Sequence, residues 1–149
     1  MFDSFTDRAR TVLAVADQEA GRWNREAIDT EHLLLGLIKK SGGESESTAI
    51  AILMRLPVDL CRLRQEVEQR MKRGPAEMRL GRLPQTPVAK RVITEAIEEA
   101  MSCNHHHLGT EHLLLGLLKV EEGVAWEALT ACGLTLEQAR QEVTKLTTR

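Results

Sequence analysis

The sequence has few aromatic residues and no tyrosine: phenylalanine and tryptophan together make up 3% of its 149 residues. Proteins that bind single-stranded nucleic acid stack its bases on aromatic rings, and this chain has little material for such a surface. Positive charge is not in excess either, because the formal net charge is -2, which gives no general attraction to nucleic acid or anionic membranes. No apolar run reaches the roughly 18 residues of a membrane-spanning helix. We therefore expect no nucleic acid and no membrane among its partners.

Cysteine is scarce as well. Cys61, Cys103 and Cys132 are an odd number without a Cys-x-x-Cys pair, which favours a reduced, cytoplasmic protein over a disulfide-bonded one. The first residues show no basic segment followed by an apolar one, so we expect no signal peptide. The sequence also has no GxxxxGK[ST] phosphate loop.

What the chain does contain is a repeat. The octet TEHLLLGL occupies residues 30–37 and returns unchanged at residues 110–117. A shift of 80 positions also aligns Thr6 with Thr86 and Asn24 with Asn104, and a shift of 76 aligns Arg64 with Arg140. Such internal similarity indicates one structural unit written twice. We expect repeat one at residues 1–73, a linker at 74–84 and repeat two at 85–149.

Helical periodicity and capping residues predict four helices in each repeat. Thr6, Thr30, Thr86 and Thr110 are each predicted to be the N-cap of a helix, and residues 135–138 form a capping box in front of another. The octets are too continuously apolar for a surface helix, so we expect them to be central and buried. The predicted helices span about 7–23, 30–40, 47–56, 59–71, 87–104, 111–120, 124–132 and 136–147.

No segment alternates with period two, so the predicted fold class is all-α. Neither half of roughly 70 residues would bury much core alone. We therefore expect the two four-helix units to pack together as one eight-helix domain with pseudo-twofold symmetry.

The order of these motifs resembles the Clp N-terminal repeat, the tandem domain at the front of Clp unfoldases, most of all the ClpC type. The resemblance is carried by residues 5–9 (FTDRA) and the first octet, and by Thr86-Pro87 with Ala89-Lys90 and the second octet. It covers essentially the whole chain, and it implies two four-helix repeats.

The resemblance implies a binding module without catalytic activity or cofactor. Its implied partners are adaptor proteins and protein substrates, which it passes to the AAA+ ring and protease of the Clp system. It also implies one phosphoarginine pocket in each repeat, formed by Thr6 with Glu31 and by Thr86 with Glu111. A helix N-terminus and a threonine hydroxyl would hold the phosphoryl group, while the carboxylate would hold the guanidinium. The threonines may alternatively be N-caps only, and the glutamates may only complement helix dipoles.

Three positions depart from the family pattern. Gln85 replaces an aromatic residue before the second threonine, and Val88 replaces an arginine, whereas Arg8 is kept in the first repeat. Asp29 replaces the glycine before the first TEH motif and adds a negative charge near Glu31. These differences bear on whether each pocket binds an anion.

Other functions stay open at this stage. One is a free-standing regulator that docks on an assembled Clp complex, because the sequence does not decide between such a protein and a piece of an unfoldase. Another is a metal-dependent enzyme built on Cys103 and His105, His106 and His107, although a zinc-protease helix is excluded because Gly36 and Gly116 stand where a second histidine is needed. A third is a nucleic-acid patch of basic residues around the linker: Arg70, Lys72, Arg73, Arg79 and Arg82.

Overall fold

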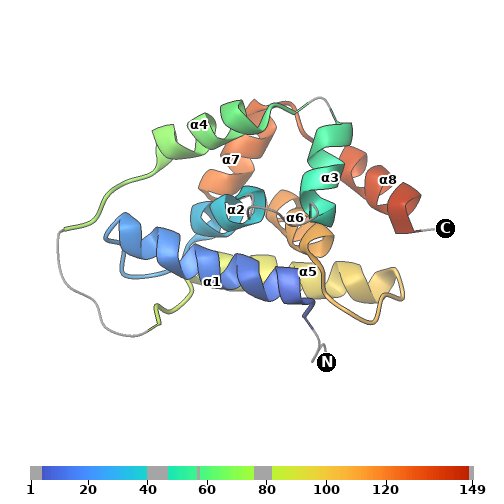
Figure 1. Ribbon diagram of the computed structural model, residues 1–149, viewed down its shortest axis with the longest axis horizontal. Coiled ribbons are helices and arrows are strands. Elements are labelled where there is room, and N and C mark those ends of the chain that lie inside the picture. The colour runs from blue at the N-terminus through green and yellow to red at the C-terminus, as the bar shows by residue number, and fades with distance from the viewer. Residues whose placement is uncertain (1–4, 40–46, 57, 76–81, 148–149) are drawn as a thin grey trace.

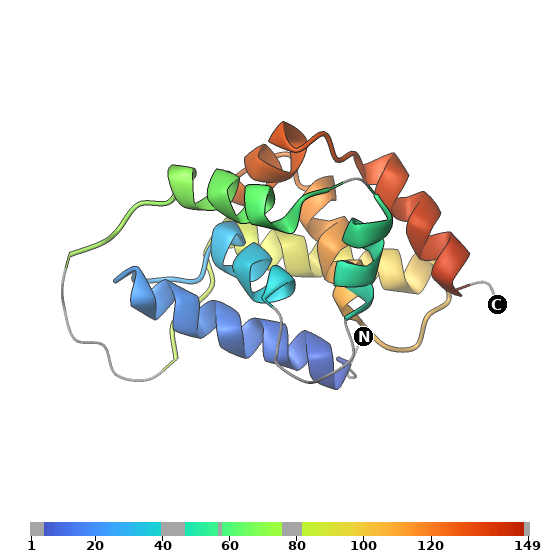
Figure 2. The same cartoon turned by 45° about the horizontal axis from the view of Figure 1, so that its top comes forward.

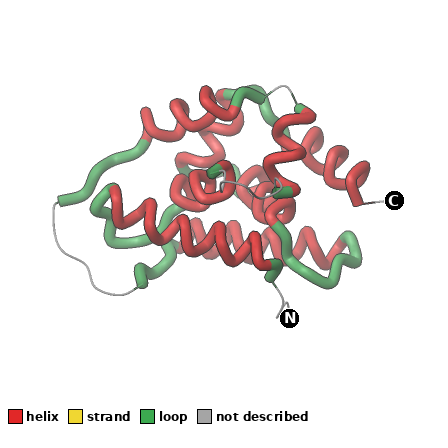
Figure 3. Tube along the Cα trace, in the orientation of Figure 1, coloured by secondary structure: helices red, strands yellow, loops and turns green. Residues whose placement is uncertain are grey.

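The computed structural model describes residues 5–39, 47–56, 58–75 and 82–147, and this part of the chain consists of helices joined by loops (Figures 1 and 3). Among these residues the β-type contacts are two isolated bridges, which join Phe5 to Leu108 and Ile28 to Gln85. The predicted all-α fold with four helices in each repeat is confirmed. The helices are α1 (Asp7–Arg22), α2 (Thr30–Ile38), α3 (Thr48–Arg55), α4 (Leu60–Arg70), α5 (Pro87–Ser102), α6 (Thr110–Lys119), α7 (Val124–Ala131) and α8 (Leu136–Thr147).

The two octets form the centre of the molecule. Figures 1 and 2 show α2 and α6 side by side, with α1 and α5 along one side and α3, α4, α7 and α8 over the other. All nine residues of α2 are buried, and so are eight of the ten residues of α6. A helix surrounded in this way needs no polar stripe, which explains the unbroken run of leucines.

A glycine in each octet lets the first two helices of a repeat approach closely. A Cβ atom on Gly36 would lie 2.6 Å from the carbonyl oxygen of Val12 in α1, and Gly116 has the same relation to Val92 in α5. Asn24, two residues beyond the end of α1, has a positive φ of 54°, and Asn104 beyond α5 has one of 58°. Asparagine adopts this left-handed conformation more readily than most residues, so the chain reverses and α2 runs antiparallel to α1.

The third helices of the two repeats are exchanged. Helix α3 packs against α6 and α8 of repeat two, whereas α7 packs against α2 and α4 of repeat one. The buried hydroxyl of Thr30 accepts a hydrogen bond from the Ala125 N–H at the start of α7 (3.3 Å), and Thr110 accepts one from the Ala49 N–H at the start of α3 (3.0 Å). The repeats are therefore interlocked around the pseudo-twofold axis.

These contacts correct two of the predicted caps. Thr30 and Thr110 are the first residues of α2 and α6, and the N-caps are Asp29 and Gly109. Each threonine instead bonds a helix of the other repeat, which sequence-local capping rules do not describe. The capping box before α8 is confirmed, because the Thr135 hydroxyl accepts from the Gln138 N–H at 3.2 Å and the Gln138 side chain accepts from the Thr135 N–H at 3.2 Å.

Most of the predicted linker, residues 76–81, lies outside the described residues. Among the helices of the described ranges, none combines the length and apolarity needed to cross a lipid bilayer.

Candidate functional site

The two threonines expected to hold an anion stand at equivalent helix starts. Thr6 is the N-cap of α1, and its hydroxyl oxygen accepts a hydrogen bond from the Ala9 N–H at 3.1 Å. Thr86 caps α5 in the same way through the Ala89 N–H, also at 3.1 Å. Both threonines are half-buried, so each helix N-terminus has its cap and still reaches the surface.

Backbone hydrogen bonds tie each threonine to the segment that precedes the TEH motif of the other repeat. The Thr6 N–H donates to the Leu108 carbonyl at 2.9 Å, and the Thr86 N–H donates to the Ile28 carbonyl at 2.9 Å. Thr6 therefore lies beside the start of α6, which carries Glu111. By the same relation, Thr86 lies beside the start of α2, which carries Glu31.

The hairpin of α1 and α2 separates the threonine and the glutamate of one repeat. Helix α1 has 16 residues, which at 1.5 Å per residue makes it about 24 Å long. Because α2 runs antiparallel to α1, Glu31 lies at the far end of α1 from Thr6. Each threonine is thus bonded beside the TEH motif of the other repeat rather than that of its own.

The two glutamates differ in their surroundings. Glu111 is half-buried, and its carboxylate lies over Gly109, so that a Cβ atom at position 109 would collide with it. Glu31 is only 5% exposed, and in the described part of the chain its Oε1 atom has no hydrogen-bond partner. Burial raises the pKa of both glutamates, and the charge of Asp29 raises the pKa of Glu31 further.

Asp29 occupies the position that corresponds to Gly109. Its Oδ1 atom accepts hydrogen bonds from the Thr30 N–H at 2.8 Å and from the Thr86 hydroxyl at 3.0 Å. The second bond joins the repeats at the N-terminus of α5. A surface cavity of about 320 Å³ opens beside it, lined by Asn24, Arg25, Glu26, Ala27, Asp29, Gly74, Pro75 and Thr86.

The histidines of the TEH motifs have a structural role. The Nδ1 atoms of His32 and His112 accept hydrogen bonds from the Asp29 and Gly109 N–H groups, each at 2.9 Å. Each histidine thereby completes the N-terminal turn of its helix. Burial lowers the pKa of both histidines to about 4, so both rings are neutral near pH 7 and accept these bonds.

The two histidines differ in the surroundings of their second ring nitrogen, Nε2. A neutral His112 carries its proton on Nε2, because Nδ1 accepts the Gly109 bond, and Nε2 lies 2.7 Å from His105 Nδ1. In repeat one Arg25 takes the place of His105, and the buried Nε2 of His32 has no partner among the described residues. No pattern in the sequence indicates that a histidine outside the octet supports the second motif.

The Cys103 and histidine cluster does not assemble a metal site. Within the described ranges no group of three or more histidine, cysteine or acidic side chains is arranged to hold a metal ion. His105 instead bonds His112, while Cys103, His106 and His107 are exposed.

The basic residues near the linker are partly engaged within the molecule. Arg70 pairs with Glu66 at 2.7 Å. Arg73 stacks over the Trp23 ring at 5.1 Å and donates to the Arg22 carbonyl at 2.9 Å. Arg79 lies outside the described residues. The placement of Arg70 and Arg73 favours a structural role over a nucleic-acid patch.

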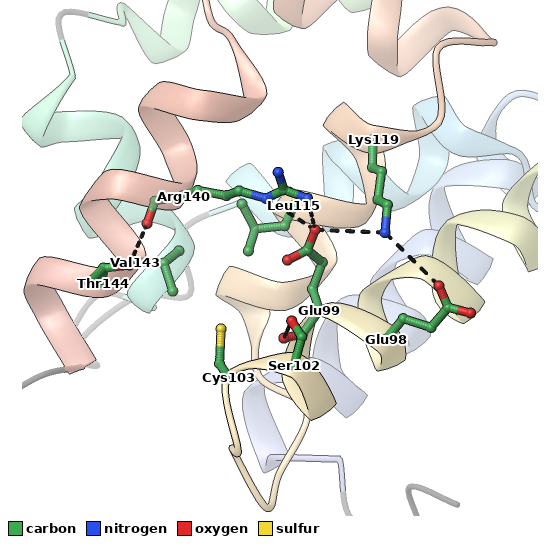
Figure 4. A pocket seen from close by; sticks show the side chains of 9 residues that line it. All are labelled: Glu98, Glu99, Ser102, Cys103, Leu115, Lys119, Arg140, Val143 and Thr144. Atoms are coloured by element: carbon green, nitrogen blue, oxygen red, sulfur yellow. Dashed lines mark hydrogen bonds and ion pairs between the residues drawn. The ribbon is translucent and has the colours of Figure 1, made fainter.

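A second cavity, of about 490 Å³, lies between α5 and α8 and is shown in Figure 4. Its centre is the buried Glu99, which pairs with Arg140 of α8, while the Lys119 Nζ atom lies 3.9 Å away. Repeat one has an equivalent pair, because Arg64 of α4 lies 3.6 Å from the buried Glu19. A charge pair that occurs in both repeats and ties the first helix to the fourth is structural. The alignment of both residue types between the repeats was its signal in the sequence.

Comparison with known proteins agrees with the repeat architecture. The chain matches the family described as the Clp repeat (R) N-terminal domain over residues 4–104 and again over 85–149. It is 41% identical over 146 residues to the Bacillus subtilis protein named negative regulator of genetic competence ClpC/MecB, and 39% identical over 146 residues to the chaperone protein ClpB of Oceanobacillus iheyensis. Each match covers 98% of this chain but 17% of the relative, so the chain spans about one sixth of the length of these relatives.

A solved structure shows the same fold. The N-terminal domain of the caseinolytic protease associated chaperone ClpD from Arabidopsis thaliana superposes with a TM-score of 0.71 at 23% identity. The match covers 98% of this chain and 96% of that one.

Proposed function

The chain belongs to the Clp repeat N-terminal domain family, and on this premise we propose that it is a protein-recognition module of the Clp unfoldase and protease system. It binds adaptor proteins and substrates for transfer to an AAA+ ring and its protease, and carries out no chemistry of its own. Its working compartment is the cytoplasm, in keeping with three unpaired cysteines, Cys61, Cys103 and Cys132.

The chemical group that it recognises is phosphoarginine, a guanidinium that carries an anionic phosphoryl group. A site for this group needs a positive element for the phosphoryl end and a negative element for the guanidinium end, close to each other. A helix N-terminus with free N–H groups attracts the anion, and a carboxylate accepts paired hydrogen bonds from the guanidinium.

The observation that carries the proposal is the hydrogen bonding that places each first-helix start against the opposite TEH motif. The Thr6 N–H to Leu108 carbonyl bond sets the N-terminus of α1 next to the segment that leads into Glu111. The Thr86 N–H to Ile28 carbonyl bond does the same for α5 and Glu31. This arrangement supports two sites between the repeats, each of which combines a helix N-terminus with a carboxylate.

Calorimetric titration with free phosphoarginine tests this function. The wild-type protein is expected to bind, and the double variant Glu31→Ala/Glu111→Ala to bind at least tenfold more weakly because the guanidinium loses its acceptor. Glu121→Ala is a matched control, since it removes an exposed glutamate just beyond the end of α6. Arginine and inorganic phosphate, titrated separately, measure each half of the ligand. Equal binding heats for the wild type and the double variant would overturn the proposal.

A second titration addresses proteins as ligands. An unstructured carrier protein is phosphorylated on arginine and compared with its unmodified form. We expect capture of the phosphorylated form alone, and competition by free phosphoarginine.

A further inference from the structure

The pairing between repeats places the departures from the family pattern at one site. Asp29, Gln85 and Val88 all lie at the combination of Thr86 with Glu31, which we call the closed site. The combination of Thr6 with Glu111, here the open site, has Phe5, Arg8 and Gly109 at the corresponding positions. The two sites are therefore unequal.

At the closed site, Asp29 already fills the place of an anion. The Thr86 hydroxyl donates its single proton to Asp29 Oδ1 at 3.0 Å, and its oxygen accepts from the Ala89 N–H at 3.1 Å. The Thr86 side chain thus has no proton left for a phosphoryl oxygen. A phosphoryl group at the N-terminus of α5 would also meet the carboxylate of Asp29, and like charges repel strongly at short range in a partly desolvated site.

At the open site, Gly109 contributes no side chain of its own at that place. Among the described residues the Thr6 hydroxyl accepts the Ala9 N–H bond and meets no carboxylate in the way Thr86 meets Asp29. The absence of a Cβ atom also allows the Glu111 carboxylate to lie over Gly109. Asp29 has a Cβ atom there, so Glu31 cannot take the same pose, and it lies buried with Oε1 unpartnered.

The helix starts differ in the same sense. Arg8 provides a cation in the first turn of α1, whereas the corresponding residue of α5 is the apolar Val88. A cation near a helix N-terminus adds to its attraction for a phosphoryl group. The closed site lacks this cation and carries the additional negative charge of Asp29.

We propose that Asp29 is a built-in occupant that closes the Thr86/Glu31 site to anions, so that the chain binds one phosphorylated guanidinium at the Thr6/Glu111 site. The inference rests on the proposed function and specifies which of its two sites is used. It makes position 29, and its counterpart at 109, the determinants of how many ligands the domain holds.

A stoichiometry experiment with free phosphoarginine tests this inference on the whole chain. The wild type is expected to bind one equivalent and Asp29→Gly two. The reciprocal variant Gly109→Asp is expected to bind at least tenfold more weakly than the wild type, because its new carboxylate enters the open site and displaces Glu111. Gly109 has a φ of -106°, a conformation that aspartate adopts without strain.

The outcomes separate the two levels of the proposal. Two equivalents bound by the wild type, or one equivalent bound by Asp29→Gly, would overturn the role of Asp29 while phosphoarginine recognition stands. No binding by either protein would overturn the proposed function itself. Circular dichroism of Asp29→Gly and Gly109→Asp checks that both remain folded, and Glu121→Ala is expected to keep the wild-type stoichiometry.

Discussion

The hydrogen bond from the Ala125 N–H to Thr30 predicts that a single hydroxyl in repeat one stabilises a helix of repeat two. Thr30 is 1% exposed and Ala125 is fully buried, so water cannot replace the bond. Thr30→Val keeps the shape of the side chain and removes the acceptor. A buried N–H left without a partner costs about 1–3 kcal/mol, and we expect a loss of about 2 kcal/mol in the free energy of unfolding. For a domain of this size that loss lowers Tm by roughly 4–8 °C.

The equivalent change in the other repeat provides a matched comparison. Thr110→Val removes the acceptor for the Ala49 N–H, but α3 has its own cap in Ser47, which bonds the Ile50 N–H at 3.2 Å. An N-cap hydroxyl can serve either of these positions, so Ser47 compensates in part. The N-cap of α7 is Gly123, which has no side chain. Thr30→Val is therefore expected to be more destabilising than Thr110→Val by about 1 kcal/mol.

Urea unfolding followed by circular dichroism measures both losses, with Tm as a second readout. Thr30→Ser is the control, because it keeps the hydroxyl and removes only a methyl group, at a cost of about 1 kcal/mol or less. The reasoning fails if Thr30→Val and Thr30→Ser are equally stable, since the hydroxyl would then contribute nothing. Parallel unfolding slopes in urea are needed for the comparison to hold.

Two further predictions concern packing and pH. Gly36→Ala should destabilise the protein by about 2–4 kcal/mol, because a Cβ atom 2.6 Å from the Val12 carbonyl oxygen forces α1 and α2 apart. Gly21→Ala is the control, since nothing lies within 4 Å of its new Cβ atom, and it should be neutral or stabilising by up to about 1 kcal/mol. Thermal unfolding compares the two variants. Burial lowers the pKa of His32 and His112 from 6.5 to about 4, so the unfolded chain binds more protons in that window and stability is lost as the pH falls through it. Each histidine contributes about 2 kcal/mol of that loss by pH 5. The raised pKa values of Glu31 and Glu111 act in the opposite direction. The test is therefore whether urea unfolding of the double variant His32→Asn/His112→Asn has a flatter pH dependence than that of the wild type, and equal slopes would refute it.

Much of the fold could be predicted because repetition and capping agree. Thr86 followed by Pro87 marks the start of α5, and the helical periodicity of the apolar residues gives the remaining helices to within a few residues. The continuous apolar sequence of the two octets predicts that they are buried. These features are local, and each repeat supports the interpretation of the other.

The errors arose where a local rule met a contact between repeats. Threonine is a good N-cap, but Thr30 and Thr110 begin their helices and bond α7 and α3 instead. The capping role passes to Asp29 and to Gly109, whose side-chain partner in the turn is a histidine rather than the usual glutamate or glutamine. Which distant helix a buried hydroxyl reaches depends on tertiary packing, and the sequence does not show it.

The pairing of the candidate site could have been deduced in part. A short loop between two helices makes them antiparallel, and a first helix of 16 residues then separates Thr6 from Glu31 by most of its length. That Thr6 bonds the segment before Glu111 depends on the exchanged arrangement of the repeats. Once the pairs are exchanged, Asp29, Gln85 and Val88 are no longer scattered departures but features of one site.

The claim that the open site lies between repeats is tested most directly by amide chemical shifts during a titration of the labelled protein with free phosphoarginine. We predict saturable shifts at residues 6–9 together with residues 109–112, and much smaller changes at 29–31 and 86–89. Shifts at 6–9 together with 29–31, or changes spread over the surface without saturation, would contradict the account.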